Sequence, residues 1–220
     1  MSHRSPLGGS ELFYRFIRDV LYITYRLLFH FRSSGSERVP KPSDPRGVIL
    51  APNHASYLDP PLLGISLKRR VTYLAKQYLF EHGFVGMVLR NIGAYPIKSE
   101  SSNDFRSIRD LIRILKQGAC VGVFPEGTRS EDGNLKEAEG GIGFLAVKSD
   151  AWVVPVYIAG SFAAFPKGAS KPHYGKPISV HYGEPFLASQ MGWTQGEEHY
   201  LAVGRHIMSE IKKIKESLTA

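Results

Sequence analysis

Short apolar runs alternate with helix-like segments through most of this 220-residue chain. The predicted strands cover residues 47–51, 71–75, 119–124, 152–158 and 178–182, with a short extended piece at 94–98. The predicted helices cover residues 84–90, 104–117 and 140–149, with two more that begin near residues 60 and 194. A chain that alternates strands and helices builds a parallel sheet with helices on both faces. We therefore predict an α/β fold: a mostly parallel open sheet flanked by helices, preceded by an N-terminal amphipathic helix.

That N-terminal helix is predicted over residues 11–32. Its apolar face carries Phe13, Phe16, Ile17, Val20, Thr24, Leu27, Leu28 and Phe31. Its other face carries Arg15, Arg18, Asp19, Tyr22 and Arg26. Because an arginine near the centre of a bilayer costs roughly 2.5–3.5 kcal/mol, these charges argue against a membrane-spanning helix. We expect a helix that lies on an anionic membrane surface; the alternative is a helix packed on its own domain or on a partner chain.

Residues 33–46 are rich in Ser and Pro and show no periodicity, which is typical of a linker. This composition divides the chain into two predicted parts. Residues 1–36 contain the amphipathic, membrane-associating helix, and residues 37–220 form the α/β domain that carries the chemistry.

Lys and Arg number 28 against 20 Asp and Glu, a net charge of +8, which indicates an anionic partner. No nucleic-acid motif accompanies the surplus, so we expect a membrane or a phosphorylated substrate and no nucleic acid.

Cys120 is the only cysteine and lies in a predicted apolar strand, so we predict that it is a core residue. A single cysteine allows no internal disulfide, and we expect a protein at the cytoplasmic face of a membrane. His181, His199 and His206 lack metal-ligand spacing, and we predict neither a metal nor a cofactor. Residues 1–10 show no signal-peptide pattern.

The first segment that contains candidate catalytic residues is Asn53–Pro60, which follows the predicted strand 47–51. In α/β sheets, ligand crevices open at the carboxyl ends of the strands. The loop can bring Asp59 against the His54 imidazole, so that the other ring nitrogen takes a proton from a hydroxyl. The alternative is that Asp59 only caps the helix starting at Pro60 and that His54 is a surface residue. Ser56 lacks the Gly-x-Ser-x-Gly setting of a hydrolase nucleophile and is predicted to be a hydrogen-bonding loop residue.

A second such segment, 124–130, follows the predicted strand 119–124 and should open at the same sheet edge. Gly127 allows a sharp turn and a close approach of the backbone to a ligand. Arg129 offers a planar fork for phosphate oxygens. Glu126 can orient Arg129 or bind a glycerol hydroxyl. The alternative is a surface turn with an Arg–Glu pair.

Together these residues resemble the sequence boxes of the glycerolipid acyltransferases. Asn53-His54 with Asp59-Pro60 resembles their His-x4-Asp box, residues 124–130 resemble their Pro-Glu-Gly-Thr-Arg box, and residues 154–160 resemble a later Val-Pro-Val box. The similarity covers roughly residues 37–185 and is closest to the 1-acylglycerol-3-phosphate acyltransferases. The resemblance implies transfer of a fatty acyl group from acyl-CoA or acyl carrier protein, as co-substrate, to a lysophospholipid acceptor.

The resemblance also implies roles for single residues. His54 and Asp59 would form a general base that acts without an acyl-enzyme. Substrate binding would fall to Glu126, Gly127, Thr128 and Arg129, with a lysine beside Arg129 at the acceptor phosphate. The family's middle box usually ends in arginine, whereas the run from Gly93 ends here in Lys98, so Lys98 and Lys76 are both candidates. A different acceptor (glycerol-3-phosphate or another lysolipid) and a non-catalytic lipid-binding protein are the alternatives.

Overall fold

The computed structural model describes residues 10–92, 94–97, 105–192 and 197–218. Its strands are β1 (Arg32–Ser34), β2 (Val48–Pro52), β3 (Thr72–Lys76), β4 (Tyr95–Ile97), β5 (Cys120–Gly122), β6 (Trp152–Ala159), β7 (Ser179–Tyr182) and β8 (Phe186–Leu187). Its α-helices are α1 (Glu11–Phe29), α2 (Asp59–Ser66), α3 (Gln77–Glu81), α4 (Gly83–Ile92), α5 (Phe105–Lys116), α6 (Gly140–Ser149), α7 (Ser161–Ala164) and α8 (Glu197–Ser217). Two 3₁₀ turns, η1 (Ser36–Arg38) and η2 (Ala188–Gln190), complete the list.

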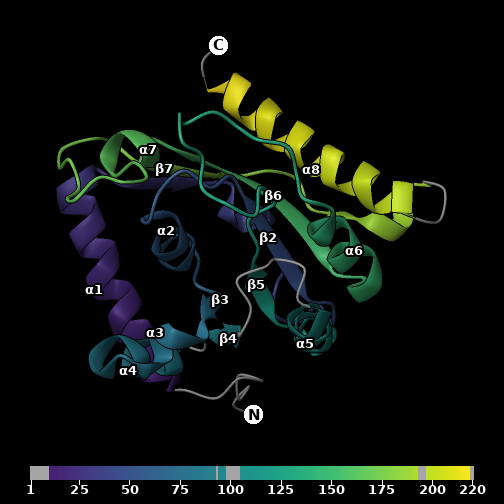
Figure 1. Cartoon of the computed structure of the whole chain (residues 1–220), viewed down its shortest axis with the longest axis horizontal. Helices are drawn as coiled ribbons and strands as arrows, with labels where there is room; N and C mark the ends of the chain where they lie inside the picture. The colour runs from purple at the N-terminus through teal and green to yellow at the C-terminus, as the bar shows by residue number, and fades with distance from the viewer. Residues whose placement is uncertain (1–9, 93, 98–104, 193–196, 219–220) are drawn as a thin grey trace.

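The strands form one sheet in the order β1-β7-β6-β2-β5-β3-β4, with β8 added to β6 (Figure 1). The pairs β1–β7, β6–β2, β2–β5, β5–β3 and β3–β4 are parallel, whereas β6 pairs antiparallel with β7 and β8. The predicted α/β fold with a mostly parallel open sheet is therefore confirmed. Because β2 lies between β5 and β6, the loop that follows β2 starts near the middle of the sheet.

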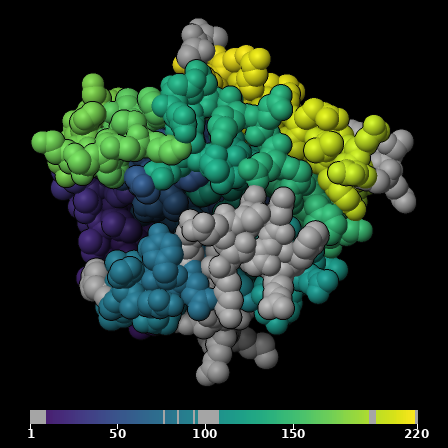
Figure 2. Space-filling view, viewed as in Figure 1, coloured from purple at the N-terminus to yellow at the C-terminus, as the bar shows by residue number. Residues whose placement is uncertain are grey.

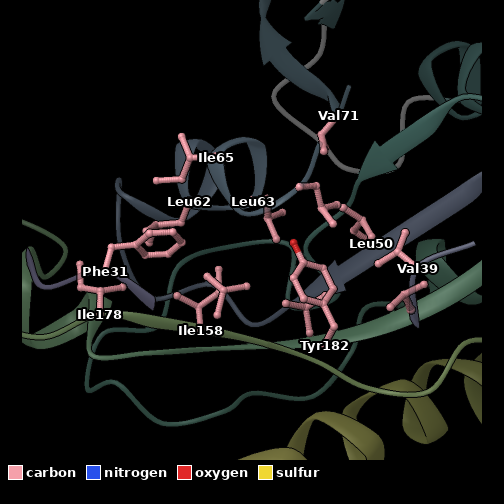
Figure 3. Packing of buried hydrophobic residues seen from close by; sticks show 14 of the residues in the cluster. Phe31, Val39, Leu50, Leu62, Leu63, Ile65, Val71, Ile158, Ile178 and Tyr182 are labelled. Carbon is pink, nitrogen blue, oxygen red and sulfur yellow. The ribbon is translucent and has the colours of Figure 1, made fainter. Parts of the chain in front are cut away.

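Two apolar cores lie on opposite faces of this sheet. Val48 and Leu50 of β2 belong to the core shared with α1 and α2, and Ile49 and Ala51 belong to the core shared with α5, α6 and α8. This alternation explains why every residue of β2 is buried and why its sequence is apolar throughout. Figure 3 shows part of the first core, with the side chains of α2 packed over those of β6 and β7.

The segment after α1 differs from the predicted linker. Helix α1 ends at Phe29 because His30 adopts a left-handed conformation with φ +47°. Phe31, predicted on the apolar face of the helix, instead lies beyond it and is fully buried in the first core. Arg32–Ser34 pair with β7 as an edge strand, and Val39 is also buried. Three residues are too few to show a strand periodicity, so composition alone suggested a linker.

Helix α1 has one face on the domain and one in solvent. Tyr14, Tyr25 and Phe29 are its buried side chains, and the Tyr14 hydroxyl accepts the Val71 N–H at 3.2 Å. An exposed apolar stripe runs along the other side and comprises Leu12, Phe16, Val20, Ile23 and Leu27, each 45–79% exposed. Phe16, Val20 and Leu27 were among the residues predicted for the apolar face, whereas Leu12 and Ile23 were not. Among the described residues, the search for a helix with the length and apolarity to cross a bilayer finds none.

The structure differs from the sequence predictions, or leaves them untested, at three helix positions. Asp59 is not the N-cap of α2: Leu58 holds that position without a side-chain bond, and Asp59 lies in the first turn. The short helices α3 and α7 were not predicted, because one turn of helix leaves no clear period. The predicted start of the C-terminal helix, near residue 194, lies outside the described residues.

Candidate active site

The loop after β2 is fixed at its start by Asn53. The buried Asn53 amide donates to the Ile158 carbonyl at 3.2 Å, and its oxygen accepts the Ile158 N–H at 2.7 Å. Both bonds reach β6, the neighbouring parallel strand. The next residue, His54, is thereby held at the carboxyl end of the sheet, where the sequence placed it.

His54 and Asp59 face one another within this loop. The His54 Nδ1 lies 2.8 Å from the Asp59 Oδ2, and the same oxygen accepts the N–H groups of Ala55 and Ser56 at 2.7 Å each. The carboxylate thus folds back into the loop instead of capping α2, and it is fully buried. Because this oxygen is an acceptor, Nδ1 carries the proton and Nε2 is left as the basic nitrogen. The structure thus confirms the predicted contact between the His54 ring and the Asp59 carboxylate.

Phe124 and Glu126, in the loop after β5, contact His54 from the other side. The Phe124 ring stacks on the imidazole with centroids 3.8 Å apart and an interplanar angle of 22°. The Glu126 Oε1 accepts the His54 backbone N–H at 2.8 Å, and its Oε2 accepts the Lys136 N–H at 3.1 Å. The Ser130 N–H donates to the His54 carbonyl at 2.7 Å. These contacts join the two loops at one sheet edge, as the sequence predicted.

Glu126 therefore has a different place from the one expected. Its side chain is 2% exposed and both of its oxygens accept backbone N–H groups, so it holds the loops together instead of orienting Arg129 or reaching a glycerol hydroxyl. Burial raises the pKa of this carboxyl, while the bonds from His54 and Lys136 act in the opposite direction. Sequence position alone could not distinguish a ligand-facing glutamate from a buried one.

Gly127 and Thr128 form the turn between Glu126 and Arg129. Gly127 has φ +66°, and a Cβ at this position would meet the carboxyl group of Glu139. The Thr128 hydroxyl accepts a bond from the Lys136 Nζ at 2.7 Å. Lys136, which sequence reasoning did not single out, therefore adds a cation to this turn.

The Arg129 guanidinium lies over an aromatic ring. Its guanidinium carbon is 3.5 Å from the ring centroid of Tyr57, a cation–π arrangement. Tyr57 in turn contacts Phe165 at 5.7 Å between centroids. The buried Arg129 Nη1 has no hydrogen-bond partner in the described part of the chain. Tyr57 and Phe124 both lie within the two sequence boxes, so their aromatic character was the available signal.

A cavity of about 560 Å³ connects these groups to an apolar interior. His54, Tyr57 and Arg129 line its polar end. The remaining lining comes from α1, α2, β3, α3 and α4 and comprises Tyr14, Ile17, Arg18, Leu21, Pro60, Pro61, Gly64, Ile65, Tyr73, Leu74, Ala75, Leu79, Val88, Leu89 and Ile92. A single cavity thus has a proton acceptor and a guanidinium at one end and an apolar channel at the other.

The structure also gives the positions of the other residues that the sequence singled out, except Lys98. Lys76 is the last residue of β3, where it pairs with Ile97 of β4, and Lys98 lies outside the described residues. Ser56 is fully buried and its hydroxyl donates to the Phe165 carbonyl at 2.7 Å, which confirms the predicted loop role. Cys120 is buried, which raises the pKa of its thiol to about 12 and confirms it as a core residue. No group of three or more potential metal ligands occurs among the described residues.

Comparisons with family models, curated proteins and solved structures all match this chain to acyltransferases. The family model described as "Acyltransferase" matches residues 30–159. The chain is 29% identical over 210 residues to a 1-acyl-sn-glycerol-3-phosphate acyltransferase of Bacillus subtilis, covering 93% of this chain and 98% of that protein. A chloroplastic 1-acyl-sn-glycerol-3-phosphate acyltransferase of Arabidopsis thaliana is 31% identical over 136 residues, which span 61% of this chain and only 37% of the longer plant protein. The crystal structure of the 1-acyl-sn-glycerophosphate acyltransferase PlsC from Thermotoga maritima superposes with a TM-score of 0.73 at 27% identity, covering 96% of this chain and 80% of that one.

Proposed function

The chain belongs to the acyltransferase family and is an O-acyltransferase, and from this premise we propose that it acylates 1-acylglycerol-3-phosphate. The donor is acyl-CoA or acyl carrier protein, and the product is phosphatidic acid. The observation that carries the proposal is the pairing of His54 and Arg129 at one end of a single cavity. A proton acceptor and a guanidinium that line the same cavity suit the two ends of a small anionic alcohol.

The proposed reaction is direct transfer. The His54 Nε2 takes the proton of the acceptor hydroxyl while the hydroxyl oxygen attacks the thioester carbonyl carbon. The carbon–sulfur bond then breaks, the carbonyl is restored as an ester, and the imidazolium returns the proton to the departing thiolate. The buried Asp59 carboxylate stabilises the imidazolium between these steps. A positioned base of this kind contributes about 10²–10⁴-fold to the rate.

Arg129 is proposed to bind the acceptor phosphate. The contact with Tyr57 holds the guanidinium at the polar end of the cavity, where its planar fork would suit phosphate oxygens. Binding a non-reacting phosphate in this way would orient the hydroxyl toward His54. Gly127 and Thr128 shape the same turn, and Lys76 or Lys98 is proposed as a second phosphate ligand.

The apolar part of the cavity is proposed to hold the transferred acyl chain. Apart from Arg18, its lining is aliphatic and aromatic, and burying each methylene there is worth about 0.8 kcal/mol. Helix α1, which provides part of this lining, is also proposed to place the enzyme on an anionic membrane surface at the cytoplasmic face. Its exposed stripe would enter the bilayer, with Arg15 and Arg26 beside it near the lipid phosphates.

The test is acyl transfer by the purified protein. With an acyl thioester and 1-acylglycerol-3-phosphate, we expect phosphatidic acid and free thiol in equal amounts. His54→Ala should lower this rate by about 10²–10⁴-fold while the far-ultraviolet circular dichroism stays unchanged. An unchanged rate in this variant would remove His54 as the base. Glycerol-3-phosphate and other lysolipids in the same assay define the acceptor, and vesicle binding without turnover of any donor would favour a non-catalytic lipid-binding protein.

A further inference from the structure

The loop between α7 and β7, residues 165–177, is basic and exposed. It contains three lysines and neither Asp nor Glu. Lys167 forms an ion pair with Glu131 at 2.7 Å. Lys171 and Lys176 are exposed, and neither has an acidic partner among the described residues. This short loop therefore carries two positive charges without an acidic partner, and the sequence predicted no role for them.

This loop is fixed against the C-terminal end of α1. The Gly175 N–H donates to the Leu28 carbonyl at 2.8 Å, and the Tyr174 ring lies 5.8 Å from that of Phe29. Tyr174 is 62% exposed, and Leu27 at the end of the apolar stripe is 73% exposed. In Figure 2 the segment (light green) lies beside α1 (purple). The basic loop is therefore held at the end of α1 at which the exposed apolar stripe also ends.

The other end of the loop contacts the catalytic loop. The Ser56 hydroxyl donates to the Phe165 carbonyl at 2.7 Å, Ser56 and Pro166 form an isolated antiparallel bridge, and the rings of Tyr57 and Phe165 lie 5.7 Å apart. The residue that supports Arg129 therefore touches the start of the 165–177 loop. Residues 165–177 connect α1 to the polar end of the cavity.

We propose that the 165–177 loop binds the headgroups of anionic phospholipids in the bilayer surface that α1 enters. Lysines close to an anionic bilayer are attracted to it, and tyrosine side chains favour the interface between headgroups and acyl chains. An anionic bilayer would match both the positive charge of the loop and the apolar stripe of α1. An acidic protein partner would match the charge but not the stripe. This inference rests on the membrane role proposed for α1 and adds a second, electrostatic contact.

The test compares two double variants that remove equal charge. Lys171→Gln with Lys176→Gln changes the loop, and Lys212→Gln with Lys213→Gln changes α8, which packs on the opposite face of the sheet. Co-sedimentation with vesicles of phosphatidylcholine and phosphatidylglycerol gives the partition coefficient. At about 1 kcal/mol per lysine, the loop variant should bind roughly 25-fold more weakly, and the α8 variant should stay within about twofold of the unaltered protein. Equal binding by the two variants would overturn the proposal.

A third variant separates this inference from the membrane role of α1. Phe16→Ser with Leu27→Ser removes two members of the apolar stripe and should weaken binding to vesicles both with and without phosphatidylglycerol. The loop variant should lose binding only where phosphatidylglycerol is present. If the α1 variant weakens binding and the loop variant does not, the loop proposal fails alone. If the loop variant instead raises only the KM for acyl carrier protein, the loop binds the donor and the lipid proposal is wrong.

Discussion

The two ends of the cavity are built in different ways. At the polar end, short bonds and ring contacts fix each side chain: His54 by Asp59 and Phe124, and Arg129 by Tyr57. At the apolar end, the lining is drawn from five elements between residues 14 and 92, and packing holds it in place. The contrast separates two kinds of effect. Changes at the polar end should alter the rate and acceptor binding, and changes at the apolar end should alter the choice of acyl chain.

The largest expected effect is that of Asp59→Asn. The asparagine oxygen can still accept the N–H groups of Ala55 and Ser56, so the loop should fold. Without the negative charge, however, the imidazolium loses its stabilising partner and the ring its fixed tautomer. We expect kcat to fall by about 10²–10⁴-fold with little change in either KM, measured by release of free thiol.

Asp132→Asn is the matched control for Asp59→Asn. Asp132 is exposed, and bonds from the Asn134 backbone and side chain and from Ser130 lower the pKa of its carboxyl to about 2. Because Asp132 does not contact His54, the control should keep kcat within about twofold of the unaltered enzyme. A similar loss in both variants would mean that the effect at Asp59 is not specific to the proposed base.

Glu126→Gln should have the next largest effect. Both Glu126 oxygens accept backbone N–H groups, whereas glutamine has one oxygen and one NH₂ group, so either His54 or Lys136 loses its acceptor. A buried unsatisfied N–H costs about 1–3 kcal/mol, which should lower Tm by roughly 2–12 °C. The resulting displacement of His54 should lower kcat by up to about 10²-fold. Thermal unfolding and acyl transfer measure the two effects.

The control for Glu126→Gln is the same substitution at Glu131. That side chain is 81% exposed and pairs with Lys167 at the surface, so its loss should leave Tm and kcat nearly unchanged. Were Glu126→Gln to behave like Glu131→Gln, the carboxylate would not be what joins the two catalytic loops.

Tyr57→Leu tests the support beneath Arg129. Removing the ring removes the cation–π contact that holds the guanidinium, so we expect the KM for the phosphate-bearing acceptor to rise by about tenfold, with kcat and the donor KM changing little. Tyr57→Phe keeps the ring and should restore the acceptor KM. A lysolipid without a phosphate monoester should show no such difference. A fall in kcat with an unchanged acceptor KM would contradict the proposed role.

These two ends also differ in how far the sequence predicted them. His54 and Asp59 are only five positions apart in the sequence. Both boxes follow apolar strands, so a parallel sheet brings them to the same edge. The partners of Glu126 and the ring beneath Arg129 depend on where side chains turn, which no spacing records. The apolar end was beyond prediction altogether, since its residues look like ordinary core until α1, α2 and α4 are placed around them. The edge strand Arg32–Ser34 was missed for a related reason, because its pairing with β7 joins residues about 150 positions apart.

The smallest expected effect is at Gly64, in the apolar end of the cavity. A Cβ there would lie 3.0 Å from the Tyr73 hydroxyl, so the larger Gly64→Val side chain must occupy space in the cavity. We expect the ratio of kcat/KM for long over short acyl donors to fall by about fivefold, the change that about 1 kcal/mol of lost chain binding produces. Gly141→Val is the control, because Gly141 lies on α6 with no atom within 4 Å of its Cβ position. If both variants lower the rate equally for every chain length, the cavity does not select the acyl chain, and the apolar end would serve stability alone.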